Sequence, residues 1–284
     1  MICEKTKEKI AFVACSLCAA VVVAALAILI FDIIMNGVGT ISWEFITEAP
    51  RRSMSEGGIF PALFGTFVIS FAAIVLAFPI GVLTAVYLTE YSKEDMFARL
   101  INAAIANLAG VPSIVFGLFG FAIFVTFMGF GPSIIAGSLT LALMALPVII
   151  KTSQEAILSV PRDFREASLA LGATKWQTVW NHVLPYAMPG ILTGTIISLA
   201  RIAGETAPVL FTVAAYFLPS LPNSLFDQSM VLTYHLYILA TQSINLKKTL
   251  PLQYGTALVL LMLVLSMNLA AILLRSHYRR RYRW

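Results

Sequence analysis

Long runs of apolar residues constrain this chain more than any other feature of its sequence. A helix needs about 20 mostly apolar residues to cross the hydrocarbon core of a membrane. The sequence predicts six such helices, at about 10–36, 59–88, 101–127, 133–150, 185–204 and 252–274. We expect Pro112 to kink the third helix without ending it, and Gly110, Gly117 and Gly120 to let other helices approach it closely.

The composition supports this interpretation. With 59% hydrophobic and 12% charged residues, the chain has too little polar surface for a soluble domain. The first apolar run is longer than a signal peptide and lacks a small-residue cleavage site, so we expect no cleavage there. Cys3, Cys15 and Cys18 fall in or before that run, where we expect Cys15 and Cys18 to face lipid or a neighbouring helix and to bind no metal. Three separate histidines predict interfacial positions and no metal site: His182, His235 and His277.

The distribution of positive charge predicts the orientation. If the N-terminus is cytoplasmic, the inner segments contain 14 of the 19 Lys and Arg residues, the outer segments contain Arg51, Arg52, Lys247 and Lys248, and Arg201 stays within the membrane. Because cytoplasmic loops are enriched in basic residues, we expect six spans with both termini in the cytoplasm. Residues 209–218 are too short to span and residues 225–243 are weakly amphipathic, so both predict an outer re-entrant or interfacial region, with a further span as the alternative.

We therefore divide the chain into three parts. Residues 1–58 form the N-terminal tail, the first transmembrane helix and an outer loop. Residues 59–275 form a core of five helices, with an inner insertion at 152–184 and the outer region at 209–250. Residues 276–284 are a basic tail. Beside a span, such a tail favours contact with anionic lipid and a role in topology over nucleic-acid binding.

The inner insertion contains start and stop signals for two short helices. Pro161 suits a first helical position, Gly172 suits the left-handed residue that closes a helix, and Thr174 with Gln177 matches a capping box. The pattern leaves two alternatives open, a hairpin lying on the membrane surface and a rigid knob that docks in a partner's groove.

A resemblance favours the second alternative. Glu166-Ala167-Ser168, then Gly172 and Leu184-Pro185, looks like the EAA signature of binding-protein-dependent ABC importer permeases, with Ser168 in place of the usual Ala and Val183 where Ile is often seen. The resemblance implies an all-α type I importer (MetI-like) fold whose coupling hairpin docks in an ATPase. The coupling residues it implies are Arg165, Glu166, Ala167, Ser168, Leu169, Gly172, Ala173 and Lys175.

Three further runs are similar to the A-type permease of the phosphate-specific transport system, the PstA family. They cover 57–66, 110–117 and 200–212, and Ala207-Pro208 after Gly-Glu-Thr favours the A-type over its partner permease. The resemblance implies a phosphate importer in the inner membrane. Its implied partners are an ATPase homodimer that holds ATP and Mg, a second, C-type permease, an extracytoplasmic phosphate-binding protein, phosphate and membrane lipids. It implies no cofactor in this chain.

Two charges inside the fifth span are the candidate substrate site. Arg201 falls roughly 18 Å along its helix from Pro189, near the bilayer middle, where a charge is costly unless it faces a cavity or a partner. Glu205, four residues on, would share its helix face and can pair with it. One interpretation is a structural ion pair. The other is a path in which Arg201 contacts phosphate and Glu205 masks Arg201 when the path is empty, with Thr206 beside them.

Other function classes fit less well. A permease for another oxyanion (sulfate, molybdate or phosphonate) remains an alternative. A secondary anion transporter would need ion-coupling acids in several spans, and only Glu205 lies deep in the membrane. A membrane enzyme would need a clustered catalytic set, and no phosphate-cradling nucleotide loop is present, so we expect neither catalysis nor ATP binding in this chain.

Overall fold

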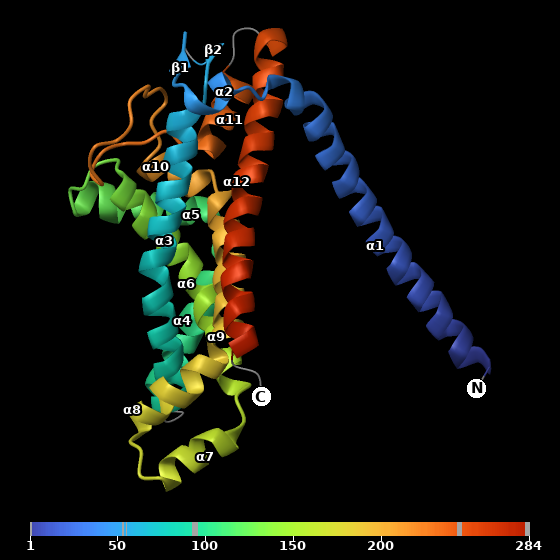
Figure 1. Ribbon diagram of the computed structural model, residues 1–284, viewed down its shortest axis with the longest axis vertical. Helices are drawn as coiled ribbons and strands as arrows, with labels where there is room; N and C mark the ends of the chain where they lie inside the picture. Colours follow the sequence, from blue (N-terminus) through green and yellow to red (C-terminus); the bar gives the residue numbers. More distant parts are fainter. Residues whose placement is uncertain (1, 53, 55, 93–95, 243–245, 282–284) are drawn as a thin grey trace.

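The protein is a long helical bundle. The computed structural model describes residues 2–52, 54, 56–92, 96–242 and 246–281. Within them, five helices are long and apolar enough to cross a membrane, or up to six if one bent pair counts as a single span, which confirms the prediction of about six. Figure 1 shows the bundle with short strands and loops gathered at one end and a helical hairpin at the other. We call these the loop end and the hairpin end.

Four helices form the body of the bundle. They are α3 (Phe60–Val86), prolonged by a π-helical turn η2 (Tyr87–Tyr91), α6 (Ile134–Leu158), α9 (Leu184–Ala203) and α12 (Leu246–Arg281). α6 packs along both α3 and α9, and α12 packs along α9. Glycines let the axes approach: a Cβ on Gly81 would lie 2.6 Å from the Cγ2 atom of Ile149, and one on Gly194 would collide with Thr152.

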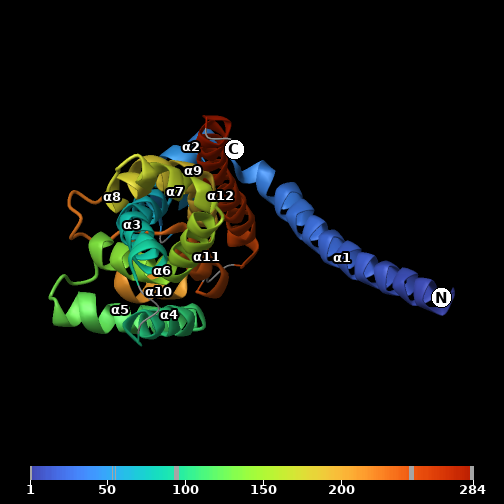
Figure 2. The same cartoon turned by 90° about the horizontal axis from the view of Figure 1, so that it is seen from below.

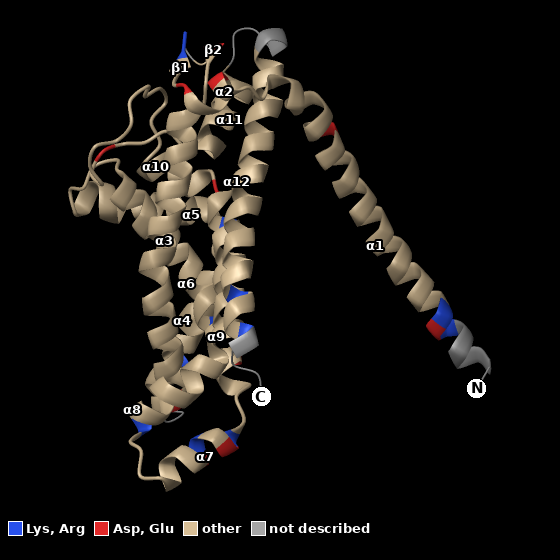
Figure 3. Cartoon of the chain, in the orientation of Figure 1, with Lys and Arg blue, Asp and Glu red and all other residues tan. Residues whose placement is uncertain are grey.

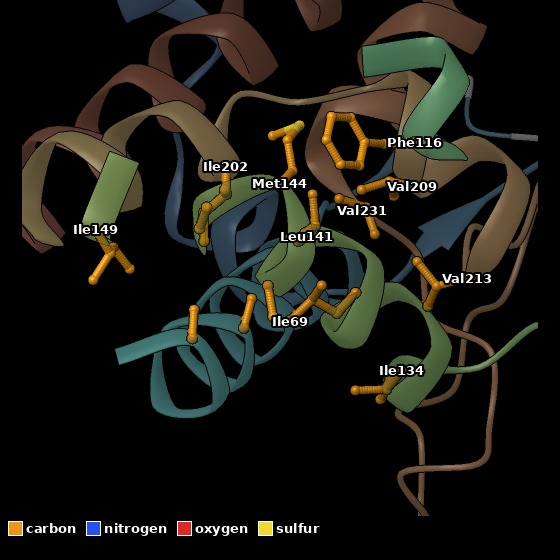
Figure 4. Close-up of a cluster of buried hydrophobic side chains, with 14 residues drawn as sticks. Ile69, Phe116, Ile134, Leu141, Met144, Ile149, Ile202, Val209, Val213 and Val231 are labelled. Atoms are coloured by element: carbon orange, nitrogen blue, oxygen red, sulfur yellow. The ribbon is translucent and has the colours of Figure 1, made fainter. Parts of the chain in front are cut away.

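The core lies where α3 and α6 meet the loop-end helices. Figure 4 shows buried side chains from α3, α6, α9 and the segment after α9 converging on one another, among them Ile69, Leu141, Ile202 and Val209. Ile69, Leu141 and Ile202 are at most 2% exposed. Because lipid is as apolar as these side chains, close packing is what holds the helices together here.

The structure corrects the expected third span. α4 (Met96–Ala109) and α5 (Ser113–Gly120), which runs on as the π-helical segment η3 (Phe121–Phe127), meet at a bend of 107°. Pro112 has an extended backbone (φ −60°, ψ 144°) and precedes the first residue of α5, so it separates two helices rather than kinking one. Two of the three expected close approaches are confirmed: a Cβ on Gly117 would lie 2.9 Å from the Ala207 carbonyl oxygen, and one on Gly120 would collide with Thr140. A Cβ on Gly110 would meet only the Asn107 carbonyl of the preceding helix, at 3.5 Å, so no other helix approaches there.

The loop end is built from short elements that do not span. It contains a 3-10 turn η1 (Val38–Thr40), α2 (Trp43–Thr47), an antiparallel pair β1 (Pro50–Arg51) and β2 (Glu56–Gly57), α10 (Ala207–Thr212) and α11 (Leu232–Thr241). Neither 209–218 nor the described part of 225–243 adds a span, as predicted. The connection between α10 and α11 caps α6 instead, because Ile134 N and Ile135 N donate to the carbonyls of Asp227 (3.0 Å) and Leu225 (2.9 Å).

His235 is buried inside the protein, which the expectation of an interfacial position did not include. It lies in α11, is 3% exposed, and its Nδ1 atom has no hydrogen-bond partner within the described residues. Burial lowers the pKa of His235 from 6.5 to about 4, because the charged form would lose its hydration. The imidazole is therefore neutral at physiological pH.

The first helix stands apart from the bundle. α1 (Ile2–Gly37) reaches α12 only near the loop end, where Tyr254 Oη donates to Asp32 Oδ2 at 3.0 Å, and then diverges in both views (Figure 1, Figure 2). None of its apolar window is buried, and Cys15 and Cys18 are exposed, as the sequence predicts for a helix that faces lipid or a neighbour.

Basic residues gather at one end of the bundle. Figure 3 shows blue segments mainly in the half of the bundle towards the hairpin and at the N-terminal end of α1. At the loop end, Arg51 and Arg52 pair with Glu48 (3.1 Å) and Glu56 (2.7 Å). Some of the counted basic residues lie outside the described residues or have side chains outside them: Lys5, Lys93, Lys247, Lys248, Arg280, Arg281 and Arg283.

Candidate functional site

The hairpin is shaped by its caps. α7 (Arg162–Ala170) begins one residue later than expected, because Pro161 precedes the first helical residue instead of occupying it. Gly172 has φ +84°, the left-handed conformation that the sequence predicts. Thr174 and Gln177 form the expected capping box at the start of α8 (Lys175–Thr178): Gln177 N donates to Thr174 Oγ1 at 3.3 Å, and Thr174 N donates to Gln177 Oε1 at 2.8 Å.

The two helices of the hairpin differ more than expected. α6 continues to Leu158, not Ile150, so the first part of the expected insertion prolongs a span. α8 is not a separate short helix, because it continues through the π-helical segment η4 (Val179–Val183) into α9 as one rod, Lys175–Ala203. The second helix of the hairpin is thereby continuous with the fifth span.

Arg165 fixes α7 to the bundle. Its Nε and Nη2 atoms donate to Oε1 of Glu90 at 3.0 and 2.7 Å, and further bonds reach the carbonyls of Val160 (2.7 Å) and Ile157 (2.9 Å). The Arg165 and Glu90 side chains are only 18% and 10% exposed. Arg165 therefore ties α7 to the bundle inside the protein, whereas it was expected among the residues that dock in the ATPase. We call the Arg165–Glu90 ion pair the bracket. Glu90 was not among the predicted site residues, and its signal in the sequence is a lone acid just after the apolar run 59–88.

Ser168 joins the hairpin's two helices. Its hydroxyl is hydrogen-bonded to that of Thr178 at 2.9 Å, and both residues are buried. The serine that departs from the usual third alanine of the EAA signature therefore has a partner in α8. Ala173 is half-buried beside this contact.

The tip of the hairpin is exposed and partly apolar. Leu171 is 90% exposed and Leu169 49%. The other exposed candidates are Glu166, Ala167, Gly172 and Lys175. An apolar side chain that is exposed to this extent is typical of a residue that docks into a partner protein.

Arg201 and Glu205 meet at a helix break. α9 ends at Ala203, Gly204 follows as its cap, and α10 begins after Thr206, so Glu205 lies between two helices rather than on the face of one. Pro208, in the first turn of α10, lacks the N–H that a continuous helix would use. The expectation that both charges share one uninterrupted helix is wrong, although the pairing is present.

The ion pair is loose. Arg201 Nε lies 3.7 Å from Glu205 Oε1, beyond hydrogen-bond distance, and the two side chains are 42% and 18% exposed. The backbone is held more firmly, because Thr233 Oγ1 donates to the Glu205 carbonyl at 2.9 Å and α5 packs against α10. Thr206 is half-buried at the same break. A partly exposed guanidinium beside a loosely held carboxylate can take a second anion.

Comparison with known proteins matches the chain to one family, and the relatives it finds are permeases as well. Residues 77–284 match the family described as "Binding-protein-dependent transport system inner membrane component". The chain is 36% identical to "Probable ABC transporter permease protein YqgI" of Bacillus subtilis, covering 94% of this chain and 95% of that protein. It is 40% identical to "Phosphate transport system permease protein PstA 1" of Mycobacterium tuberculosis, covering 85% of this chain and 77% of that protein.

Solved structures show the same fold. The chain is similar to a subunit of the MetNI methionine ABC transporter in an inward facing conformation, with a TM-score of 0.58 at 22% identity, covering 78% of this chain and 94% of the other. At this identity the likeness shows a type I importer permease fold and says nothing of substrate.

Proposed function

The chain belongs to the family of binding-protein-dependent transport system inner membrane components, and on that premise we propose that it is a permease subunit of an ATP-driven importer of inorganic phosphate. The observation that carries the substrate is the 40% identity, over most of the chain, to a relative named as a phosphate transport system permease. The helical bundle of five or six spans and the exposed hairpin are the parts that such a subunit needs.

The hairpin is the proposed ATPase coupling element. Leu171 and Leu169 would enter an apolar groove of the ATPase, with Glu166 and Lys175 at its rim. The bracket between Arg165 and Glu90 keeps α7 fixed to the spans. Movement of the ATPases would then tilt the rod Lys175–Ala203 and displace the charged break at its far end.

Arg201 is the proposed phosphate contact in the path. Its planar guanidinium can donate two parallel hydrogen bonds to phosphate oxygens. Glu205 would mask this charge when the path is empty, and it could accept a hydrogen bond from the hydroxyl of protonated phosphate, which sulfate lacks at neutral pH. The loose 3.7 Å pair supports this exchange, because little is lost when Arg201 turns to a new anion.

The remaining partners complete the proposal. An ATPase homodimer supplies ATP and Mg, a C-type permease supplies the other half of the path, and an extracytoplasmic phosphate-binding protein delivers the substrate. The basic residues at the hairpin end support a cytoplasmic position for this end and for both termini, in the inner membrane.

Uptake by the reconstituted complex tests the proposal. Vesicles containing the permease with all partners should accumulate radiolabelled phosphate only when ATP is present at the ATPases. A tenfold excess of sulfate, molybdate or phosphonate should not compete. Equal competition by one of these would reassign the substrate to that oxyanion, and uptake without the ATPase would indicate a secondary transporter.

A further inference from the structure

An apolar groove runs along the outside of the bundle at the hairpin end. Its volume is about 620 Å³, and α3, α9 and α12 all contribute to it. Representative lining residues are Phe71, Phe78, Leu192, Leu199, Ala271 and Tyr278. Phe71 remains 57% exposed, so the described chain leaves the groove uncovered there.

The groove faces away from the proposed path. Arg201 follows Leu199 by two residues, which places it about 200° further around α9. The second permease of the proposed path would close it around Arg201 and so approach α9 from the opposite side, which would leave the groove facing the bilayer.

The length of the groove matches one leaflet. On α12 it extends from Met267 to Tyr278, and 11 residues of helix correspond to about 17 Å. Half of a hydrocarbon core of about 30 Å is about 15 Å. The groove therefore runs from the membrane surface at the hairpin end to near the midplane, with a tyrosine at the headgroup level, where aromatic side chains are enriched.

The surface end of the groove is positively charged. Arg275 and Arg279 lie on either side of Tyr278 in the sequence of α12, and Figure 3 shows blue turns near this end of the helix. The sequences of α3, α9 and α12 contain no Asp or Glu at all, so these helices offer no carboxylate to neutralise the arginines. The ligand that fits has apolar chains and an anionic head.

We propose that the groove is a binding site for one anionic phospholipid of the leaflet at the hairpin end. Its acyl chains lie along α3, α9 and α12, and its phosphate is held by Arg275 and Arg279. The lipid then supports α9, the helix that joins the hairpin to Arg201. This proposal rests on the proposed function for the side of the groove that faces lipid, because the second permease closes the path at Arg201, but it is independent of which substrate is transported.

Photocrosslinking of lipid in the assembled complex tests the site. The complete transporter is placed in phosphatidylcholine vesicles that contain a trace of phosphatidylglycerol with a photoactivatable acyl chain, and labelled peptides are mapped by mass spectrometry. We expect label on the groove-lining segments of α3, α9 and α12. Unlabelled phosphatidylglycerol should compete for it, and additional phosphatidylcholine should not.

Two variants with matched controls sharpen the test. Replacing both arginines (R275Q/R279Q) should lower labelling on the order of tenfold, and Ala271→Phe should lower it by filling the groove. The controls are Arg99→Gln, an exposed arginine of α4, and Leu269→Phe, an exposed α12 residue that does not line the groove; both should label as wild type.

Three results would overturn the proposal. Equal labelling by a phosphatidylcholine probe, or labelling unchanged in R275Q/R279Q, would remove the anionic specificity. Groove segments that stay unlabelled in the wild-type complex would mean that a protein helix, such as α1 of a neighbouring subunit, covers them. Phosphate uptake is not the readout, so these failures would leave the transport assignment intact.

Discussion

At the scale of single residues, the position of Glu205 next to Arg201 leads to a testable prediction. It lies in the break between α9 and α10 and is paired loosely with Arg201 at 3.7 Å. If it masks the arginine, Glu205→Gln should leave phosphate on Arg201 longer, and phosphate imported per ATP hydrolysed should fall several-fold. The measurement is simultaneous uptake and ATP hydrolysis in reconstituted vesicles.

A carboxylate elsewhere provides the control for this prediction. Glu155→Gln, at an exposed position of α6, removes the same charge outside the break and should keep the wild-type ratio. If hydrolysis in Glu205→Gln stays coupled to the loaded binding protein and uptake is unchanged, Glu205 has no masking role.

His235 predicts a pH dependence of stability. Its pKa is about 4 in the folded protein and about 6.5 when unfolded, so below pH 6.5 the unfolded state binds a proton that the folded state rejects. The contribution of neutral His235 to the free energy of unfolding is complete above pH 6.5. Roughly 3 kcal/mol of it is lost as the pH falls towards 4. Thermal unfolding at pH 7.5 and 5 should show about 2 kcal/mol of this loss in wild type and a smaller loss in His235→Gln.

The exposed His182 is the matched control for His235. His182→Gln should retain the wild-type difference between the two pH values. An identical pH dependence in His235→Gln and wild type would show that protonation of His235 does not limit stability. The sequence could not reveal this burial, because it results from α11 packing against α3 and α12.

At the scale of elements, the bracket between Arg165 and Glu90 holds α7. Removing one partner of a largely buried pair leaves an uncompensated charge, at a cost of about 3–5 kcal/mol. We expect Glu90→Gln to speed amide hydrogen exchange in α7 without exposing α6. The exposed Arg162→Gln should leave exchange unchanged. If amide hydrogen exchange in α7 is as slow in Glu90→Gln as in wild type, contacts other than the bracket hold the hairpin.

Leu171 is the predicted docking anchor of the same element. It is 90% exposed, so Leu171→Asp should not alter the stability of the permease itself. Loss of a hot-spot contact of about 2 kcal/mol would weaken ATPase binding roughly thirtyfold. Leu158→Asp, at a 67% exposed leucine of α6, is the control. If Leu171→Asp binds the ATPase as tightly as the control Leu158→Asp, Leu171 does not lie in the interface.

Local sequence predicted some elements well and others poorly, for physical reasons. Hydropathy located the spans, and cap chemistry located Gly172 and Thr174, because both depend on neighbouring residues. The bend at Pro112 was missed because hydropathy continues through it. α6 extends past Ile150 because Lys151 Nζ and Gln154 Nε2 both donate to Asn102 Oδ1 at 3.2 Å, a contact about 50 residues away in sequence.

At the scale of the whole molecule, one rod connects the two parts of the candidate site. The hairpin tip lies at the start of Lys175–Ala203 and the charged break lies at its end. Sequence reasoning placed both features on one segment but joined them through a short helix and a separate span. The structure replaces that joint with unbroken helix, so that the hairpin and the charged break lie on one continuous segment.

The most direct test of this account is phosphate uptake together with ATP hydrolysis by the Arg201→Gln complex. Charge-assisted hydrogen bonds are worth about 1.5–3 kcal/mol, so uptake should fall roughly ten- to hundredfold, with Arg201→Lys in between. Hydrolysis stimulated by the loaded binding protein should persist, because the hairpin is intact. Wild-type uptake by a normally assembled Arg201→Gln complex would contradict the account.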